Sequence, residues 1–170
     1  MADYNFNTTP GQTVARELLM AFLNTGTQEA PVWSVVGKRV EDSSMEMDWS
    51  TETKKDILGD TYGTMKKPIV TQTFEPCELD AADTAQQKIW QLAIVQQDAA
   101  ALANMDMLIV HSYAGFAERY ESCMIAPTGL GGEGGGYVGM PIDVTYGGTR
   151  TVGTATKDAT GKITFTPEAA

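Results

Sequence analysis

Polar and apolar side chains alternate in two segments of the chain, and this alternation predicts two strands. In the first segment, positions 42–49, the odd positions are mostly apolar and every even position is polar. The even positions are Asp42, Ser44, Glu46 and Asp48. A period of two residues is typical of a strand with one solvent-exposed face. We therefore expect a strand here whose exposed face is strongly acidic.

The second alternating segment, positions 67–77, favours a partner strand. Val70 and Phe74 alternate there with polar residues, which are Thr71, Thr73 and Glu75. Thr, Val, Ile and Phe all suit the pleated conformation. The connection between the two strands, positions 50–66, is long and polar. A connection of that length usually has a function beyond joining two strands, although a mobile surface loop is the plainer alternative.

The remaining segments predict one helix and several more strands. Positions 80–103 are rich in Ala, Gln, Leu and Ile, which favour a helix with Asp80 as its N-cap. Short apolar or Thr-rich runs bounded by turn residues predict further strands. These runs are 107–113, 117–126, 142–146, 149–156 and 162–166. The apolar segment 15–23 fits either a helix or a buried strand.

These elements together define a β-rich α+β fold class. Its simplest form is a β-sandwich of two packed, mostly antiparallel sheets, flanked by one α-helix. Within the strand over 117–126, we expect Tyr120, Met124 and Ile125 to be core residues. Two segments are expected outside the core: a polar N-terminal arm, residues 1–12, and a Gly-rich loop, residues 127–141.

Length and charge narrow the function classes. The 170 residues suit a single domain, 1–170. With 22 Asp and Glu against 12 Lys and Arg, the formal net charge is −10. This charge opposes autonomous binding to nucleic acid, because affinity for phosphates comes from clustered cations. No apolar run reaches the length of a membrane span, and the first residues do not look like a signal peptide. We therefore expect folding in the cytosol and no membrane partner.

Candidate catalytic chemistry is sparse. The single histidine, His111, lies in an apolar run typical of a core histidine, and Cys77 and Cys123 are too far apart to indicate a zinc site or a disulfide framework. A nucleophilic His/Cys pair stays open, since such partners meet in space rather than in sequence. The G-x-G-x-x-G pattern at 129–134 lacks the strand before it and the helix after it that a dinucleotide site needs, and Glu133 would repel a phosphate. We expect a flexible loop there, and no catalytic residue, cofactor or metal.

Three runs of sequence carry a family resemblance. They are VWSVVGKRVEDSSMEMD with TETKKDILGD at 32–60, KPIVTQTFEP at 67–76, and NMDMLIV at 104–110 after a helix that contains Trp90. In this order they resemble the tail tube (major tail) proteins of long-tailed bacteriophages and prophages. The resemblance covers roughly residues 15–126. It rests on runs of similar residues in a given order, and not on a motif of catalytic residues.

The resemblance implies a non-enzymatic structural protein that forms hexameric rings stacked into a hollow tube. On this view the acidic strand and its partner face the lumen and repel passing DNA, through Asp42, Ser44, Glu46, Asp48, Thr71, Thr73 and Glu75. The connection 50–66 reaches the adjoining ring through polar contacts of Lys54, Lys55, Asp56, Asp60 and Lys66. The implied partners are other copies of the chain, tape-measure proteins and tail-tip or terminator proteins, while viral DNA passes without specific binding. The implied location is the virion tail, assembled in the bacterial host cytoplasm.

Several alternatives stay open at this point. The acidic alternation is also what an ordinary solvated strand face looks like. A tube subunit of a contractile tail or secretion apparatus shares the same architecture. A carbohydrate- or cell-surface-binding β-sandwich would need an aromatic platform, built from Tyr113, Tyr137 or Tyr146. An enzyme would rest on His111 and the two thiols alone.

Overall fold

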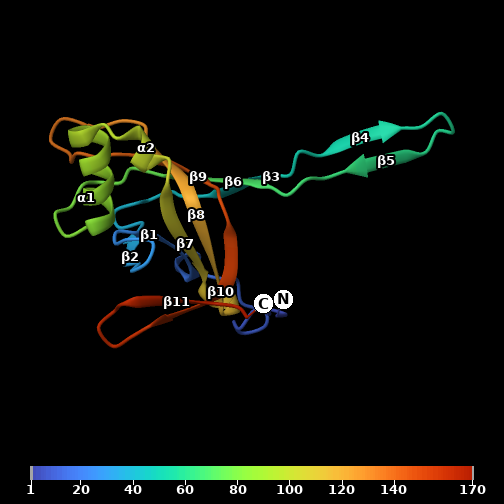
Figure 1. Ribbon diagram of the computed structural model, residues 1–170, viewed down its shortest axis with the longest axis horizontal. Helices are drawn as coiled ribbons and strands as arrows, with labels where there is room; N and C mark the ends of the chain where they lie inside the picture. Colours follow the sequence, from blue (N-terminus) through green and yellow to red (C-terminus); the bar gives the residue numbers. More distant parts are fainter. Residues whose placement is uncertain (1, 170) are drawn as a thin grey trace.

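The elements of the chain are mainly strands (Figure 1). The computed structural model describes residues 2–169. The strands are β1 (Leu19–Asn24), β2 (Trp33–Val36), β3 (Met45–Asp48), β4 (Glu52–Lys55), β5 (Thr61–Thr64), β6 (Ile69–Phe74), β7 (Met105–His111), β8 (Phe116–Pro127), β9 (Ile142–Tyr146), β10 (Arg150–Lys157) and β11 (Ile163–Pro167). The helices are α1 (Thr84–Trp90) and α2 (Ala99–Leu102), joined by a π-helical turn, Gln91–Gln96; short 3-10 turns occupy Arg16–Leu18 and Ser112–Ala114. The segment 15–23 is therefore mostly strand.

The long strand β8 joins two halves of one curled antiparallel sheet. Its residues 116–123 pair with β7, residues 117–120 also pair with β10, and the last four residues pair with β9. One half-sheet has the order β2-β1-β7-β8-β10-β11, and the other has the order β8-β9-β6-β3. Every pairing between these strands is antiparallel. The predicted β-rich α+β class is confirmed, with the refinement that the two packed sheets share a strand.

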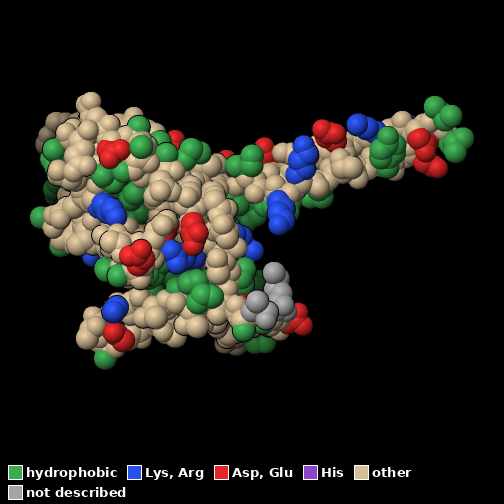
Figure 2. Space-filling view, in the orientation of Figure 1, with side chains coloured by type: hydrophobic (Ala, Val, Ile, Leu, Met, Phe, Trp, Pro, Cys, Tyr) green, Lys and Arg blue, Asp and Glu red, His purple; other side chains and the backbone are tan. Residues whose placement is uncertain are grey.

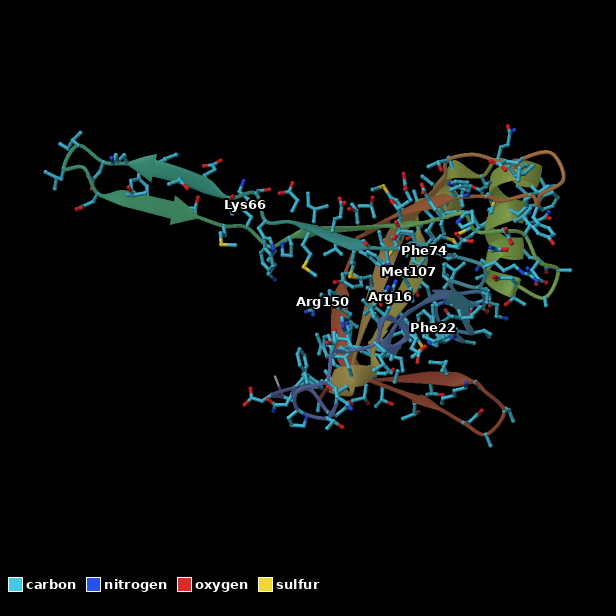
Figure 3. All side chains as sticks on the ribbon, turned by 180° about the vertical axis from the view of Figure 1, so that it is seen from behind. Arg16, Phe22, Lys66, Phe74, Met107 and Arg150 are labelled. Atoms are coloured by element: carbon cyan, nitrogen blue, oxygen red, sulfur yellow. The ribbon has the colours of Figure 1, made fainter. Side chains whose placement is uncertain are left out.

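The main core lies between the two half-sheets. Met107 from the first half-sheet belongs to the same buried cluster as Phe74 from the second (Figure 3). Leu23 and Val144 belong to this cluster as well. Helix α1 closes one end of this cluster with Ile89, which is 1% exposed. A smaller cluster lies on the other face of the first half-sheet, where the hairpin β10-β11 covers Phe22, Trp33, Leu108, Val110 and Ala117.

The predicted long helix is wrong in its bounds. Helix α1 begins three residues later than expected, with Asp83 rather than Asp80 as the N-cap, because the Asp83 side chain accepts the Gln86 amide. The Asp80 carboxylate instead accepts the Ala82 amide in the preceding turn. The helix then widens into the π-helical turn and stops at Gln97, whose φ of 52° is left-handed. A new N-cap, Asp98, starts α2.

The segment 50–66 is not a loop but a two-stranded hairpin that projects far from the body (Figures 1 and 2). Strands β4 and β5 pair from Glu52 with Thr64 to Lys55 with Thr61. All residues of both strands are exposed. The hairpin continues the β3-β6 pair outward, with Ser50 in a left-handed conformation at the junction and the Asp48 carboxylate accepting its amide. We call residues 49–66 the arm, as distinct from the N-terminal segment.

The Gly-rich segment makes several backbone hydrogen bonds. Gly131 and Gly139 exchange two backbone hydrogen bonds, of 3.1 and 2.7 Å. The Leu79 amide donates to Val138, and the Met140 amide donates to Cys77. A β-carbon on Gly139 would lie 2.6 Å from the Pro76 carbonyl oxygen, so this close approach requires glycine. The segment is thus built against the chain that follows β6.

The N-terminal segment packs on its own subunit. The Asn7 amide donates to the Tyr113 carbonyl oxygen, and the Asn7 side chain donates to the Ser112 carbonyl oxygen. The ring of Tyr4 lies 4.9 Å from that of Phe116. Within residues 2–169, no helix is long and apolar enough to cross a membrane.

Candidate functional site

One face of the second half-sheet gathers the seven residues that the sequence predicts as a group. The register places Glu46 opposite Thr71 and Asp42 opposite Glu75. Because side chains alternate along a strand, the even positions of β3 and the odd positions of β6 share this face. It therefore holds Asp42, Ser44, Glu46, Asp48, Thr71, Thr73 and Glu75, none of which is buried. That this face lines a channel stays a prediction.

Strand β9 extends the same face, a contribution that the sequence alone did not reveal. The register aligns Thr71 with Thr145 and Thr73 with Asp143. The Thr73 hydroxyl donates to the Asp143 carboxylate at 2.8 Å. The alternation of Ile142, Val144 and Tyr146 with polar residues was a usable signal, because it already predicts one exposed side for this strand.

We call this surface the acidic face. It carries five carboxylates, those of Asp42, Glu46, Asp48, Glu75 and Asp143, and none of the residues that the register places on it is Lys or Arg. Met124 and Ala126 of β8 complete it at one side. Met124 is 51% exposed, so its prediction as a core residue is wrong, whereas Tyr120 and Ile125 are buried as predicted.

Open strand edges flank the acidic face. Within residues 2–169, β3 pairs with β6 alone among the strands, and residues 124–127 of β8 pair with β9 alone. Each edge presents backbone groups that can pair with another strand. Beside the β3 edge, Met47 and Trp49 are large apolar side chains that remain 53% and 42% exposed. Edges and apolar side chains of this kind are suited to contact with other protein chains.

The arm holds the five predicted polar contact residues, Lys54, Lys55, Asp56, Asp60 and Lys66, and all are exposed. They do not form one patch. Lys54 and Lys55 are on β4, Lys66 is at the base, and Asp56 and Asp60 frame the turn at the tip. The Asp56 carboxylate accepts the amides of Leu58 and Asp60, at 2.9 and 3.0 Å, so it serves the turn itself.

The turn at the tip presents two apolar side chains that the polar-contact prediction overlooked. Ile57 is fully exposed and Leu58 is 82% exposed. Figure 2 shows this apolar end beyond the mixed charges of the arm. The signal was present in the sequence, as an Ile-Leu pair in the middle of a polar connection.

The histidine belongs to a buried polar network centred on Glu118. The His111 Nε2 atom lies 3.0 Å from Glu118, its Nδ1 atom lies 2.8 Å from the Tyr113 hydroxyl, and Arg150 donates to Glu118 at 2.6 Å. Burial alone would raise the pKa of Glu118, but the hydrogen bonds from His111 and Arg150 outweigh it and lower the pKa. The histidine thus has partners in the sheet and neither thiol among them.

The two thiols are buried and free. Burial is the main cause that raises the pKa of Cys77 to about 12 and that of Cys123 to about 11. Thiolates are therefore scarce at neutral pH, which disfavours both as nucleophiles. Among residues 2–169, no group of three or more His, Cys, Asp and Glu side chains is arranged to hold a metal ion.

The three tyrosines of the sugar-binding alternative lie in different parts of the fold. Tyr146 is buried in the core, where its hydroxyl donates to Gln72 at 2.6 Å. Tyr137 is on the Gly-rich segment, and Tyr113 is beside the N-terminal segment. The G-x-G-x-x-G pattern does follow a strand, β8, contrary to the prediction, but the next regular element is strand β9 and not a helix. The pyrophosphate site of a dinucleotide fold is therefore missing at this position.

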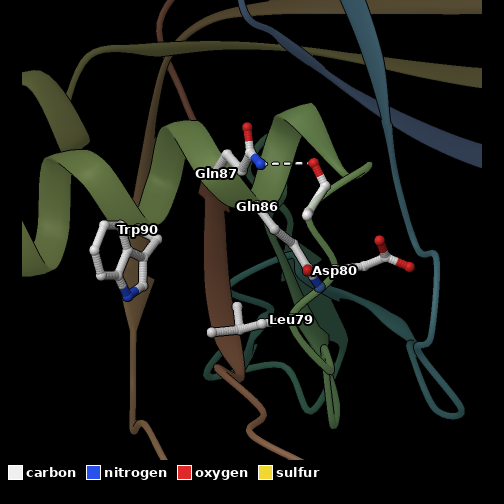
Figure 4. Close-up of a pocket in the computed structure, with 6 residues that line it drawn as sticks. Leu79, Asp80, Gln86, Gln87 and Trp90 are labelled. Carbon is white, nitrogen blue, oxygen red and sulfur yellow. Dashed lines mark hydrogen bonds between the residues drawn. The ribbon is translucent and has the colours of Figure 1, made fainter.

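A small pocket of about 200 Å³ lies beside α1 (Figure 4). Leu79, Asp80, Gln86, Gln87 and Trp90 line it, and the Gln87 side chain donates to the Ala81 carbonyl oxygen at 2.6 Å. It contains the single carboxylate Asp80, whose pKa is lowered first by the Ala82 amide and then by Arg39. An ionised Asp80 with its donors already placed is not suited to acid–base chemistry.

Comparison with known proteins identifies the fold. No family model matches the sequence, and no curated protein is significantly similar to it. Among solved structures, a chain of the PVC extracellular contractile injection system, from its sheath-tube complex in the extended state, is 6% identical over 85% of this chain and 94% of that one, with a TM-score of 0.51. The tube-terminating cap of the anti-feeding prophage is 11% identical over 88% of this chain and 96% of that one, with a TM-score of 0.52.

These similarities establish a tail-tube-like β-rich fold, as the sequence resemblance predicted. They do so over nearly the full length of both chains, while the identity is too low to carry more than the fold. The first neighbour belongs to a contractile injection system, and the second is a tube-terminating cap of a prophage. A specific relationship to long-tailed bacteriophages is therefore not what the comparison supports.

Proposed function

We propose that this chain is the structural subunit of a hollow tube in a phage-tail-like particle, formed by stacked hexameric rings through which DNA passes. The acidic face carries the proposal, because five carboxylates without a cation line one side of a four-stranded half-sheet that has open edges at both sides. Ring closure would pair these edges and leave the acidic face on a single curved wall.

The dimensions of such a wall suit a double helix. Six copies that each contribute β8, β9, β6 and β3 give about 24 strands, and a strand spacing of about 4.8 Å gives a diameter of roughly 37 Å. Side chains of about 5 Å on each wall leave a bore of roughly 25 Å. Carboxylate repulsion that decays over about 8 Å at physiological salt reaches much of that bore, so DNA slides without binding.

A tube subunit of a contractile apparatus is the second candidate, and one structural neighbour favours it, because that chain belongs to a contractile injection system. The two candidates share the ring, the bore and the absence of enzymatic activity, and they differ in whether a sheath surrounds the tube. In either case the partners are further copies of the chain together with tape-measure and terminator proteins. The place of action is the virion or particle, assembled in the host cytoplasm.

Negative-stain electron microscopy of the purified protein, with light scattering on a sizing column, tests the tube directly. We expect rings or hollow tubes that grow with protein concentration. A persistent 18.3 kDa monomer, even with tape-measure and terminator proteins present, would contradict the proposal.

A matched pair of charge variants tests the lumen assignment. Glu46→Lys with Asp48→Lys changes the acidic face, and Glu17→Lys with Glu29→Lys makes the same change of net charge at exposed positions elsewhere. Assembled tubes are incubated with short duplex DNA at physiological salt and then treated with nuclease. We expect protected DNA with the first pair and none with the control pair or the unchanged protein. Equal protection with both pairs would place the acidic face outside the lumen.

A further inference from the structure

The Gly-rich segment forms a wide cleft. It has a volume of about 670 Å³. It lies between residues 129–141 on one side and, on the other, the segment just before β3 and the segment just after β6. We call it the Gly-rich cleft. Its apolar lining comes from Pro76, Leu130, Tyr137 and Pro141, and its acidic lining comes from Glu41, Glu78 and Glu133.

The apolar rim of this cleft is uncovered. Leu130 is 49% exposed and Tyr137 is 73% exposed. The backbone beneath them is fixed by the two hydrogen bonds between Gly131 and Gly139 and by the Gly136 amide, which donates to Glu133. A β-carbon on Gly132 would collide with the Tyr137 carbonyl oxygen, so glycine is required for the tight path of this segment. The cleft is a formed surface with apolar groups that no part of residues 2–169 covers.

The tip of the arm is the complementary surface. Ile57 and Leu58 are presented outward by a turn that the Asp56 carboxylate fixes, and Gly59 takes the left-handed φ of 88° that this turn needs. Directly behind them on β4 are Lys54 and Lys55. The arm therefore offers two aliphatic side chains followed by two cations, and the cleft offers apolar side chains together with carboxylates.

The two surfaces lie at opposite ends of the long axis of the subunit. Figures 1 and 3 both show the arm at one end, and the segment between β8 and β9 at the other end beside α1. An arm cannot reach the cleft of its own subunit. The nine residue-to-residue steps from Trp49 to Leu58 span roughly 30 Å of extended chain, so the tip can reach a neighbouring copy.

We propose that the arm tip of one copy docks in the Gly-rich cleft of the next copy, with Ile57 and Leu58 against Leu130 and Tyr137 and the lysines toward the glutamates. This assignment rests on the proposed tube and deepens it, because it replaces the polar inter-ring contact with an apolar anchor and gives the Gly-rich segment a receiving role. Contact between different surfaces of identical chains is heterologous, and it propagates without closing when copies are stacked along the axis.

The charges agree with this pairing. Within residues 2–169, Glu78 is the one cleft glutamate with an ion-pair partner, Arg39 at 3.8 Å, which leaves Glu41 and Glu133 for a cation from outside. Lys55 is exposed and has no ion pair in the same part of the chain, while Lys54 is 3.8 Å from Glu52. Charges of this kind set orientation and register, and the apolar side chains supply most of the affinity.

Disulfide cross-linking between two variants, each with one added cysteine, tests the contact. Leu58→Cys protein is mixed with Tyr137→Cys protein under mild oxidation, and the control mixture pairs Leu58→Cys with Thr156→Cys, an exposed site on β10. The native thiols stay silent because they are buried and have raised pKa values. We expect the Leu58–Tyr137 heterodimer and little of the control heterodimer.

The outcomes separate this contact from the tube itself. If unchanged protein forms tubes and the Leu58–Tyr137 heterodimer is no more abundant than the control, the docking is overturned and the tube function stands. If the heterodimer forms and no tubes are seen, the docking stands and the tube function fails. If neither the heterodimer nor tubes form, both the docking and the tube function are contradicted.

A second pair of variants measures the anchor without new thiols. Leu58→Ser should raise the protein concentration needed for assembly by about tenfold or more, since an exposed Leu that becomes buried on docking contributes on that scale. The matched control, Thr61→Ser on the same arm, should leave that concentration within about twofold. Equal behaviour of the two variants would overturn the anchor.

Discussion

Strands β5 and β6 are close in sequence, but different interactions stabilise them. Along β6, Val70, Gln72 and Phe74 are buried and the residues between them face outward, so the strand is fixed by the core behind it. Along β5, every residue is exposed, and the strand is fixed by its ladder with β4 alone. An isolated two-stranded hairpin is marginally stable in water. The body therefore supplies the folding free energy, and the residues of the arm are free to serve contacts outside the subunit.

The largest expected effect is in the core of the body. Phe74→Ala removes a side chain that is 2% exposed and packs between the half-sheets. We expect a loss of about 3–5 kcal/mol in the free energy of unfolding, measured by urea denaturation. Val32→Ala, at an apolar side chain that is 52% exposed, serves as the control. A loss below about 1 kcal/mol for Phe74→Ala would mean that the half-sheets do not depend on this contact.

The next effect is a pH dependence that only the body should show. The folded pKa of Glu118 is lower than its unfolded pKa, so its contribution to stability is present above about pH 4.3 and is lost as the pH falls through the folded pKa. Glu118→Gln should reduce the free energy of unfolding at pH 7 and flatten its decrease between about pH 5 and pH 3. Denaturant titrations at several pH values measure this slope. An unchanged slope would show that Glu118 is not held ionised by His111 and Arg150.

Removal of the arm should change stability little and should prevent assembly. Replacement of residues 51–65 by a short Gly-Ser turn leaves the core clusters intact, since none of their members lies in that segment. We expect a free energy of unfolding within about 1 kcal/mol of that of the unchanged protein. Electron microscopy should show no tubes. Unfolding of the shortened chain would mean that the arm is part of the body after all.

The smallest effect is expected on the surface of the arm. Tyr62→Ala removes a side chain of β5 that is 53% exposed and belongs to neither buried cluster. The free energy of unfolding should stay within about 0.5 kcal/mol. A larger change would show that the arm packs on the body in solution.

The sequence predicted the strands of the body better than those of the arm, because only buried strands leave a period in the sequence. Alternation identified β3 and β6, because burial on one side selects apolar residues at every second position. Strands β4 and β5 bury nothing, so their side chains carry no period and they were expected to be a loop. Met124 and Ile125 were both expected in the core, but adjacent residues of one strand point to opposite faces, and only Ile125 is buried.

The candidate surfaces were predictable to different extents. The acidic residues of β3 and β6 could be grouped because the two alternating segments follow each other along the chain and were expected to pair. The addition of Asp143 could not be foreseen, because it depends on which strand neighbours β6 in space. The helix was overextended because Ala and Gln favour helix throughout positions 84–103, while the break at Gln97 is a backbone conformation that composition does not encode.

The placement of arm and Gly-rich cleft at opposite ends gives any polymer built by their contact a direction. One terminus of such a tube displays unoccupied arms, and the other displays empty clefts. The two termini are then chemically distinct, so growth and capping at each need a different partner: a cap with this fold and no arm would stop elongation at one terminus, and a cap without the cleft would stop it at the other. Orientation of the particle, and hence which end meets the target, would be fixed by the first subunit laid down.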